Sequence, residues 1–241
     1  MNIIIIPAVT DSHTRYQNPN PEFDELAFLT RIADGIHARL TQSAKHTPFI
    51  TIRKLTGTMD QIIAQLKQLT QTSRPSSNRI IAIGLNATRL DGRYHTATGW
   101  SIIKSSQSKE ISRLATALTT EAMQSLGPRA ASAAPNPYSL SFLNQIRIIT
   151  ATTIPAVLTL NLYQDNRQDT AYLLSSAGHQ AIIDLHVKGI SAYLSTLNPG
   201  NTPAIRQATA LRSQRHRKSG SAESQSRIPT SHQTHAQNPP A

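Results

Sequence analysis

The stretch PAVLTLNLYQDNRQDTAYLLSSAGHQAIIDLHVKGISAYL, residues 155–194, decides the fold. It opens with a short apolar run that is typical of a buried strand, and a strand is predicted over residues 156–161. Its last part repeats apolar residues at helical spacing, so a final helix is predicted over roughly residues 177–197. In α/β proteins, reacting groups usually lie at the carboxyl end of a strand. The residue near that end is Leu160, whose side chain has no reactive group.

Length and composition limit the class of protein. The 241 residues suffice for one α/β core but not for two large domains. The absence of cysteine excludes disulfides, a thiolate nucleophile and a cysteine zinc cluster. The opening MNIIIIPAVTDSH has no basic region and its isoleucines end at Pro7, so we expect no signal peptide. No later apolar run is long enough to span a bilayer, and we expect a soluble, cytoplasmic protein.

The formal net charge is +11, and much of the excess lies near the carboxyl terminus. Residues 198–241 are rich in Ser, Gln, Pro, Arg and His and poor in apolar residues, so they are predicted to form a disordered basic tail. The charge favours contact with polyanions such as nucleic acid or anionic lipid. Nonspecific adhesion is favoured over a dedicated nucleic-acid site, because no aromatic-rich sheet motif or recognition helix accompanies the charge.

The first 197 residues alternate predicted strands and helices. Strands are predicted over residues 2–6, 49–55, 79–85 and 100–104, near 147–149, and over 156–161. Helices are predicted over residues 21–40, behind the capping box TMDQ at residues 58–61, over residues 111–126 and over 177–197. This alternation predicts one α/β domain over residues 1–197, with a twisted, mostly parallel sheet and helices on both faces.

Three segments carry a family resemblance. They are DELAFLTRIADGI at residues 24–36, IIAIGLNA joined to ATGWSIIKS at 80–87 and 97–105, and the long stretch at 155–194. In this order they resemble the bacterial zinc-dependent N-acetylmuramoyl-L-alanine amidases, over nearly all of residues 2–194. The resemblance implies the three-layer fold of these amidases. It also implies a hydrolase with zinc as cofactor, which cuts the amide bond between muramic acid and L-alanine in peptidoglycan.

The resemblance further implies where the site residues lie. The family holds zinc with a histidine, a glutamate and a second histidine, and another glutamate shuttles the proton. These four positions fall, in chain order, on Val9, Glu25, Gly84 and Leu160. Only Glu25 keeps the family residue. A structural zinc site is worth roughly 10–16 kcal/mol over about four ligands, so the loss of two ligands removes most of the metal affinity. We therefore expect no bound cofactor and no catalytic residue.

The remaining polar residues leave alternatives open. His13 and His95 follow the first and third predicted strands and, together with Glu25, form an alternative metal site. Neither histidine has metal-ligand spacing to a partner, so solvated loop histidines are the favoured interpretation. Glu25 also fits the start of a helix, where the macrodipole favours a carboxylate without any metal. Asn86 is the candidate for substrate contact, although fixing its loop through hydrogen bonds is the favoured role.

The leading functional hypothesis is a degenerate amidase, a pseudoenzyme that keeps the scaffold and a groove for peptidoglycan or muropeptide but not the chemistry. The second hypothesis is an active peptidoglycan amidase with the relocated zinc site. The third is a non-enzymatic interaction module whose basic tail binds a partner or nucleic acid in a salt-dependent way. A decaying gene without a selected function is the fourth. Because no signal peptide is predicted, we expect access to the cell wall only through lysis or an unknown export route.

Overall fold

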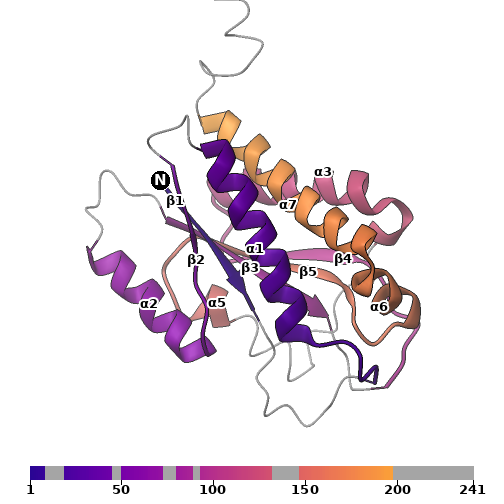
Figure 1. Cartoon of the computed structure of the whole chain (residues 1–241). Coiled ribbons are helices and arrows are strands. Elements are labelled where there is room, and N and C mark those ends of the chain that lie inside the picture. The colour runs from indigo at the N-terminus through magenta and orange to yellow at the C-terminus, as the bar shows by residue number, and fades with distance from the viewer. Residues whose placement is uncertain (9–18, 45–49, 73–79, 89–92, 132–146, 198–241) are drawn as a thin grey trace, which may run out of the picture. The chain divides into compact units, whose positions relative to one another are not determined.

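The structure is a computed structural model of the whole chain (Figure 1), and it describes residues 1–8, 19–44, 50–72, 80–88, 93–131 and 147–197. The chain divides into two units, Met1–Leu194 and Ser195–Ala241. The fold belongs to the first unit, and the described residues of the second unit only complete the last helix. The predicted tail, residues 198–241, lies outside the described residues and stays a prediction.

The described strands form one sheet. Their order is β2 (Thr51–Lys54), β1 (Asn2–Pro7), β3 (Ile80–Thr88), β5 (Ala156–Tyr163) and β4 (Trp100–Lys104). Neighbouring strands are parallel, except that β4 runs antiparallel to β5. β1 is an almost unbroken isoleucine run because it is buried on both faces of the sheet. The predicted α/β class and mostly parallel sheet are confirmed.

Three helices cover one face of the sheet, namely α1 (Glu25–Ala44), α3 (Lys109–Leu126) and α7 (Ser176–Leu197). Figure 1 shows α1 and α7 side by side across the strands. α7 also packs closely on α3, because a Cβ at Gly189 of α7 would lie only 3.0 Å from the Cα of Leu118. Among the described helices, none combines the length and hydropathy that a membrane span requires.

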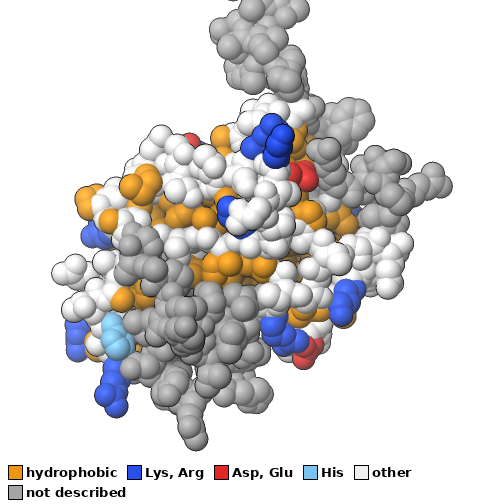
Figure 2. All heavy atoms as spheres, turned by 180° about the vertical axis from the view of Figure 1, so that it is seen from behind, with side chains coloured by type: hydrophobic (Ala, Val, Ile, Leu, Met, Phe, Trp, Pro, Cys, Tyr) orange, Lys and Arg blue, Asp and Glu red, His pale blue; other side chains and the backbone are white. Residues whose placement is uncertain are grey.

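The other face of the sheet packs against α2 (Met59–Thr72) and the short α5 (Arg147–Thr150). Alternate strand residues and both helices contribute to one apolar cluster on this face. Its buried members include Ile6, Ala8, Met59, Ile62, Leu66, Ala82, Ile148, Leu158 and Leu160. Figure 2, the view from behind, shows hydrophobic side chains in bands across the middle of the molecule. Helices on both faces of the sheet are therefore confirmed.

The helix starts follow local capping. Asp24 caps α1 by accepting a hydrogen bond from the Ala27 backbone N–H at 2.9 Å, so this helix begins at Glu25 rather than at residue 21. The predicted capping box is confirmed, because the Thr58 N–H donates to Gln61 Oε1 and the Gln61 N–H donates to Thr58 Oγ1. Local side-chain to backbone pairing thus sets both starts.

The strand predicted near residues 147–149 is wrong, since these residues form α5. The RIIT sequence favours a strand locally, but tertiary contacts decide otherwise. Arg147 pairs with Asp60 of α2, and Ile148 is fully buried in the apolar cluster. The Ala151 N–H then closes the helical turn by donating to the Arg147 carbonyl at 2.8 Å.

The segment after β5 also differs from the prediction. β5 extends to Tyr163, and a helix that the sequence did not predict, α6 (Arg167–Leu174), precedes α7. The side chain of Asn166 caps α6 by accepting from the N–H groups of Gln168 and Asp169. Before this turn, the pairing of β5 with β3 is irregular and Leu162 has φ of 65°. A left-handed leucine costs roughly 1–2 kcal/mol, which the buried surroundings of Leu162 offset.

Candidate functional site

The candidate site lies at the carboxyl ends of β1, β3 and β5. These strands are parallel neighbours, so their carboxyl ends share one edge of the sheet, where α/β proteins usually bind ligands. Gly84 of β3 pairs with Leu158 of β5, and Asn86 pairs with Leu160. Because side chains alternate between faces, positions 84 and 160 point to the same side, toward α2 and α5. The fold therefore brings two of the four predicted site positions close together.

Apolar side chains fill the space at these two positions. Leu160 is 1% exposed and belongs to the apolar cluster. A Cβ at Gly84 would lie 2.8 Å from Leu158 Cδ1 and 3.2 Å from Ile148 Cδ1. A histidine at Gly84 would therefore displace both side chains. Neither position has a ligand atom or a proton-transfer group, so these residues do not fit the zinc site that the fold family implies.

The other predicted positions are only partly described. Val9 lies outside the described residues, but its neighbour Ala8 is fully buried and donates its N–H to the Leu85 carbonyl at 2.7 Å. Asn86 lies on β3, and its side chain is not among those described. The assignments of Val9 and Asn86 therefore remain predictions.

The alternative metal site is also only partly described. Glu25 is the first residue of α1 and is half-buried, as expected of a carboxylate at a helix start. His95 is half-buried, and its backbone N–H donates to the Asp165 carbonyl at 2.8 Å. Within the described ranges, no three His, Asp or Glu side chains are arranged to hold a metal ion. His13 lies outside those ranges, so the relocated site stays a prediction.

A buried polar network holds the turn between β5 and α6. Asp169 accepts from the Thr98 hydroxyl at 2.8 Å and from the Tyr163 N–H at 3.1 Å. The Asn166 amide donates to the Ala97 carbonyl at 3.1 Å, and Gln164 donates to the Ala87 carbonyl at 2.8 Å. These hydrogen bonds hold the turn against the end of β3 and the segment before β4. The Asn at the helix start is a local signal for part of this network.

Burial raises the pKa of Asp169, although the hydrogen bonds from the Thr98 hydroxyl and the Tyr163 N–H oppose the rise. Burial, followed by the charges of Asp165 and Asp169, also raises the pKa of Tyr163. Perturbed groups of this kind often mark reactive sites. Here the hydrogen bonds of Asp169 are directed to the protein itself, which indicates a structural role for this carboxyl.

His186 of α7 is the fully buried histidine on the opposite face of β5. Its Nδ1 donates to the Ile182 carbonyl at 2.7 Å, and its Nε2 lies 2.9 Å from the hydroxyl of Thr159, which donates to it. Burial lowers the pKa of His186 to about 4, and the hydrogen bond to Ile182 opposes this only partly. The imidazole is therefore neutral at pH 7 and joins α7 to β5.

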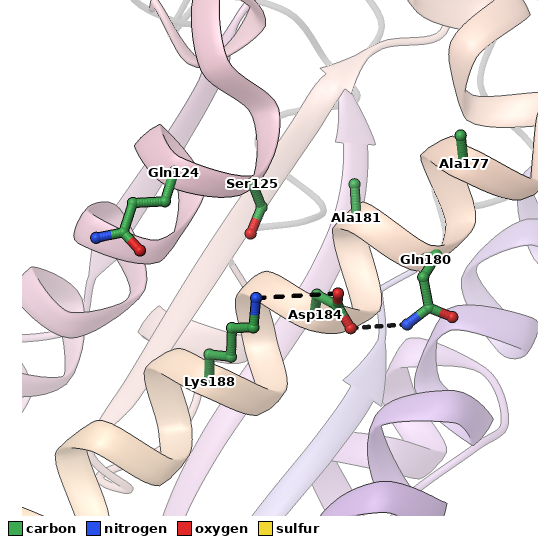
Figure 3. A pocket seen from close by; sticks show the side chains of 7 residues that line it. All are labelled: Gln124, Ser125, Ala177, Gln180, Ala181, Asp184 and Lys188. Carbon is green, nitrogen blue, oxygen red and sulfur yellow. Dashed lines mark hydrogen bonds and ion pairs between the residues drawn. The ribbon is translucent and has the colours of Figure 1, made fainter.

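A separate groove of about 520 Å³ lies between α3 and α7. Figure 3 shows that its charged side chains already pair with each other and with an amide. Asp184 accepts from Gln180 at 2.7 Å and lies 4.0 Å from the ammonium of Lys188, and it also pairs with Arg39 of α1. Burial alone would raise the pKa of Asp184, but the hydrogen bonds from Arg39 and Gln180 and the charges of Arg39 and Lys188 outweigh it and lower the pKa. This cluster joins helices and offers no reactive group.

No protein-family model matches the sequence, and no curated protein matches it either. Solved structures do match the fold. The N-acetylmuramoyl-L-alanine amidase from Clostridium difficile 630 is 12% identical over 80% of this chain and 96% of its own, with a TM-score of 0.58. The amidase AmiC2 of Nostoc punctiforme is 12% identical over 81% and 97%, with a TM-score of 0.59. Ami1 from Mycobacterium smegmatis is 17% identical over 81% and 97%, with a TM-score of 0.57. The predicted amidase fold is confirmed.

Proposed function

We propose that this protein has the amidase fold without the amidase activity, and that it binds peptidoglycan without cleaving it. The loss of activity rests on one observation. Leu160 and Gly84, at the positions of the family's proton shuttle and second zinc histidine, are enclosed by the apolar side chains of Leu158 and Ile148 and their cluster. A zinc hydrolase needs an open coordination position for water next to a proton shuttle. An apolar cluster provides neither.

Binding of peptidoglycan is the second half of the proposal, and the fold supports it. Three amidases named for this substrate match the chain over at least 96% of their own length. A fold can host many functions, so the binding needs its own test. Cosedimentation with purified, insoluble sacculi measures binding directly, and retention of the protein in the pellet is the expected result.

The direct test of inactivity uses the same sacculi with added zinc. We expect no release of peptides with a free L-alanine amino terminus, under conditions in which an active amidase releases them. Release that requires zinc and stops with a chelator would overturn the proposal.

Metal analysis tests the relocated site with His13, Glu25 and His95. We expect the purified protein to contain far less than one zinc per chain. Near-stoichiometric zinc that is lost in a His13→Ala or His95→Ala variant, but kept in the control His37→Ala, would establish the relocated site instead.

A further inference from the structure

Two arginine–tyrosine stacks lie on either side of α6. The guanidinium carbon of Arg129 is 4.4 Å from the ring centre of Tyr172, and that of Arg167 is 3.8 Å from the ring centre of Tyr94. Both arginines are exposed, whereas both tyrosines are half-buried. These four residues are called the arginine–tyrosine surface. We propose that it binds carboxylates on the peptide stems of peptidoglycan; this inference rests on the binding proposed above.

The helix geometry separates the two stacks. Arg167 and Tyr172 are five residues apart on α6, which places them about 140° apart around the helix axis. The buried residues Asp169, Thr170 and Leu173 face inward between them. A ligand that contacts both arginines must therefore cross the outer face of the helix. The exposed residues on that face are Gln168 and Ala171, which are uncharged and leave the path open.

Hydrogen bonds hold this surface in place. The segment that contains Tyr94 is tied to the turn before α6, because the His95 N–H donates to Asp165 and the Asn166 amide donates to Ala97. The Thr98 hydroxyl donates to Asp169 of α6 itself. Arg129 lies in the 3-10 turn Gly127–Ala130, which directly follows α3. Because the backbone of this surface is already held in place, little conformational entropy of the protein is lost when a ligand binds.

The charge of the surface determines the ligand chemistry. Two carboxylates lie near this surface, Asp165 in the turn before α6 and Asp169 on α6, and they are only 0% and 2% exposed. Arg129 and Arg167, in contrast, face solvent. A guanidinium above an aromatic ring still has N–H donors for a planar oxyanion, because the ring does not use them as conventional hydrogen-bond donors. The ligand is therefore a chain that carries at least two oxyanions and can cross the outer face of α6. Peptide stems of peptidoglycan carry free carboxylates on such a chain.

The test is cosedimentation of the full chain with insoluble sacculi. The double variant Arg129→Gln/Arg167→Gln is expected to bind much more weakly, by about tenfold for each arginine. Arg113→Gln is the matched control, because it removes one exposed positive charge near the other end of α3 and should bind like wild type. Ala171→Glu leaves both arginines in place and should also weaken binding, because it adds a negative charge on the path between them.

A second arm changes the ligand instead of the protein. Sacculi whose carboxylates have been amidated are expected to retain little wild-type protein. Equal retention of the double variant and wild type on native sacculi would overturn the inference while leaving peptidoglycan binding intact. Displacement of the protein from sacculi by a single-stranded oligonucleotide, dependent on the same two arginines, would overturn it in favour of a nucleic-acid surface. If the wild-type protein stays in the supernatant, both ligand binding by the arginine–tyrosine surface and the proposed binding of peptidoglycan are overturned. The proposed lack of amidase activity is tested separately by the cleavage assay.

Discussion

Replacing Leu160 with glutamate tests whether the candidate site is closed. Leu160 is 1% exposed, so a side chain at this position is shielded from water by the apolar cluster. Leu160→Gln is the matched variant, because glutamine has nearly the same shape as glutamate and no charge. Both variants lose apolar burial and bury a polar group, at a cost of roughly 3–5 kcal/mol. The difference between them isolates the cost of burying the charge.

The size of this difference follows from the pKa of the new carboxyl. An unperturbed glutamate has a pKa of about 4.3, and full burial raises the pKa by up to roughly 3–5. When folding raises the pKa of a carboxyl, ionisation does not affect the free energy of unfolding at pH values below the unfolded-state pKa. As pH rises from there toward the folded-state pKa, the protein loses stability. Leu160→Glu should therefore be less stable than Leu160→Gln by roughly 3.5 kcal/mol at pH 7, and by only about 1 kcal/mol at pH 5.

Urea unfolding at both pH values measures the difference, with the single tryptophan, Trp100, as a buried fluorescent probe. Other titrating groups affect both variants equally and cancel in the comparison. If Leu160→Glu does not fold at pH 7 but Leu160→Gln does, the predicted order still holds. Equal stability of the two variants at both pH values would refute the reasoning, because it would mean that water reaches position 160 and that the site is open.

Three further predictions concern the scaffold. Because the folded-state pKa of His186 is about 4 against 6.5 unfolded, its contribution to stability is complete above pH 6.5 and falls by roughly 3 kcal/mol toward pH 4. In urea unfolding, His186→Gln should remove most of this slope, whereas His179→Gln should remove a smaller part, because burial also lowers the pKa of the half-buried His179. Asn166→Ala should lower the free energy of unfolding by about 1 kcal/mol through the lost cap, and further through the lost hydrogen bond to the Ala97 carbonyl, whereas Asn166→Ser should restore only the cap. Gly178→Ala should lower the melting temperature strongly, because its Cβ would lie 1.9 Å from the Tyr172 carbonyl oxygen. An unchanged melting temperature would contradict the close packing of α6 on α7 at this point.

The sequence predicted those parts of the fold that local chemistry determines. The capping box at Thr58 and Gln61 involves residues three apart, and the isoleucine run of β1 has the pattern of a strand buried on both faces. α5 was missed because its RIIT sequence becomes helical only through the pairing of Arg147 with α2 and the burial of Ile148. α6 was missed because its start looked like a polar loop until Asn166 was seen to cap it.

The sequence proposed positions for the candidate site but could not predict what surrounds them. The resemblance assigned site positions to Gly84 and Leu160, and the register shows that they lie near the middle of two neighbouring strands, β3 and β5. What encloses them depends on Ile148, whose segment the sequence assigned to the wrong element. The arginine–tyrosine pairs were also out of reach, since Arg129 and Tyr172 belong to separate elements and meet only through the fold.

Gly84 and Leu160, the positions that the resemblance assigns to a zinc ligand and to the proton shuttle, also belong to the closed apolar region of the core. A polar or charged side chain that is buried without a hydrogen-bond partner costs stability. Leu160 instead adds a buried side chain to the cluster, and Gly84 lets Leu158 and Ile148 occupy the space of an imidazole. A histidine at 84 alone would meet these two side chains, and a glutamate at 160 alone would be a buried, uncompensated charge. Gly84→His or Leu160→Glu alone should therefore destabilise the fold without creating a zinc site.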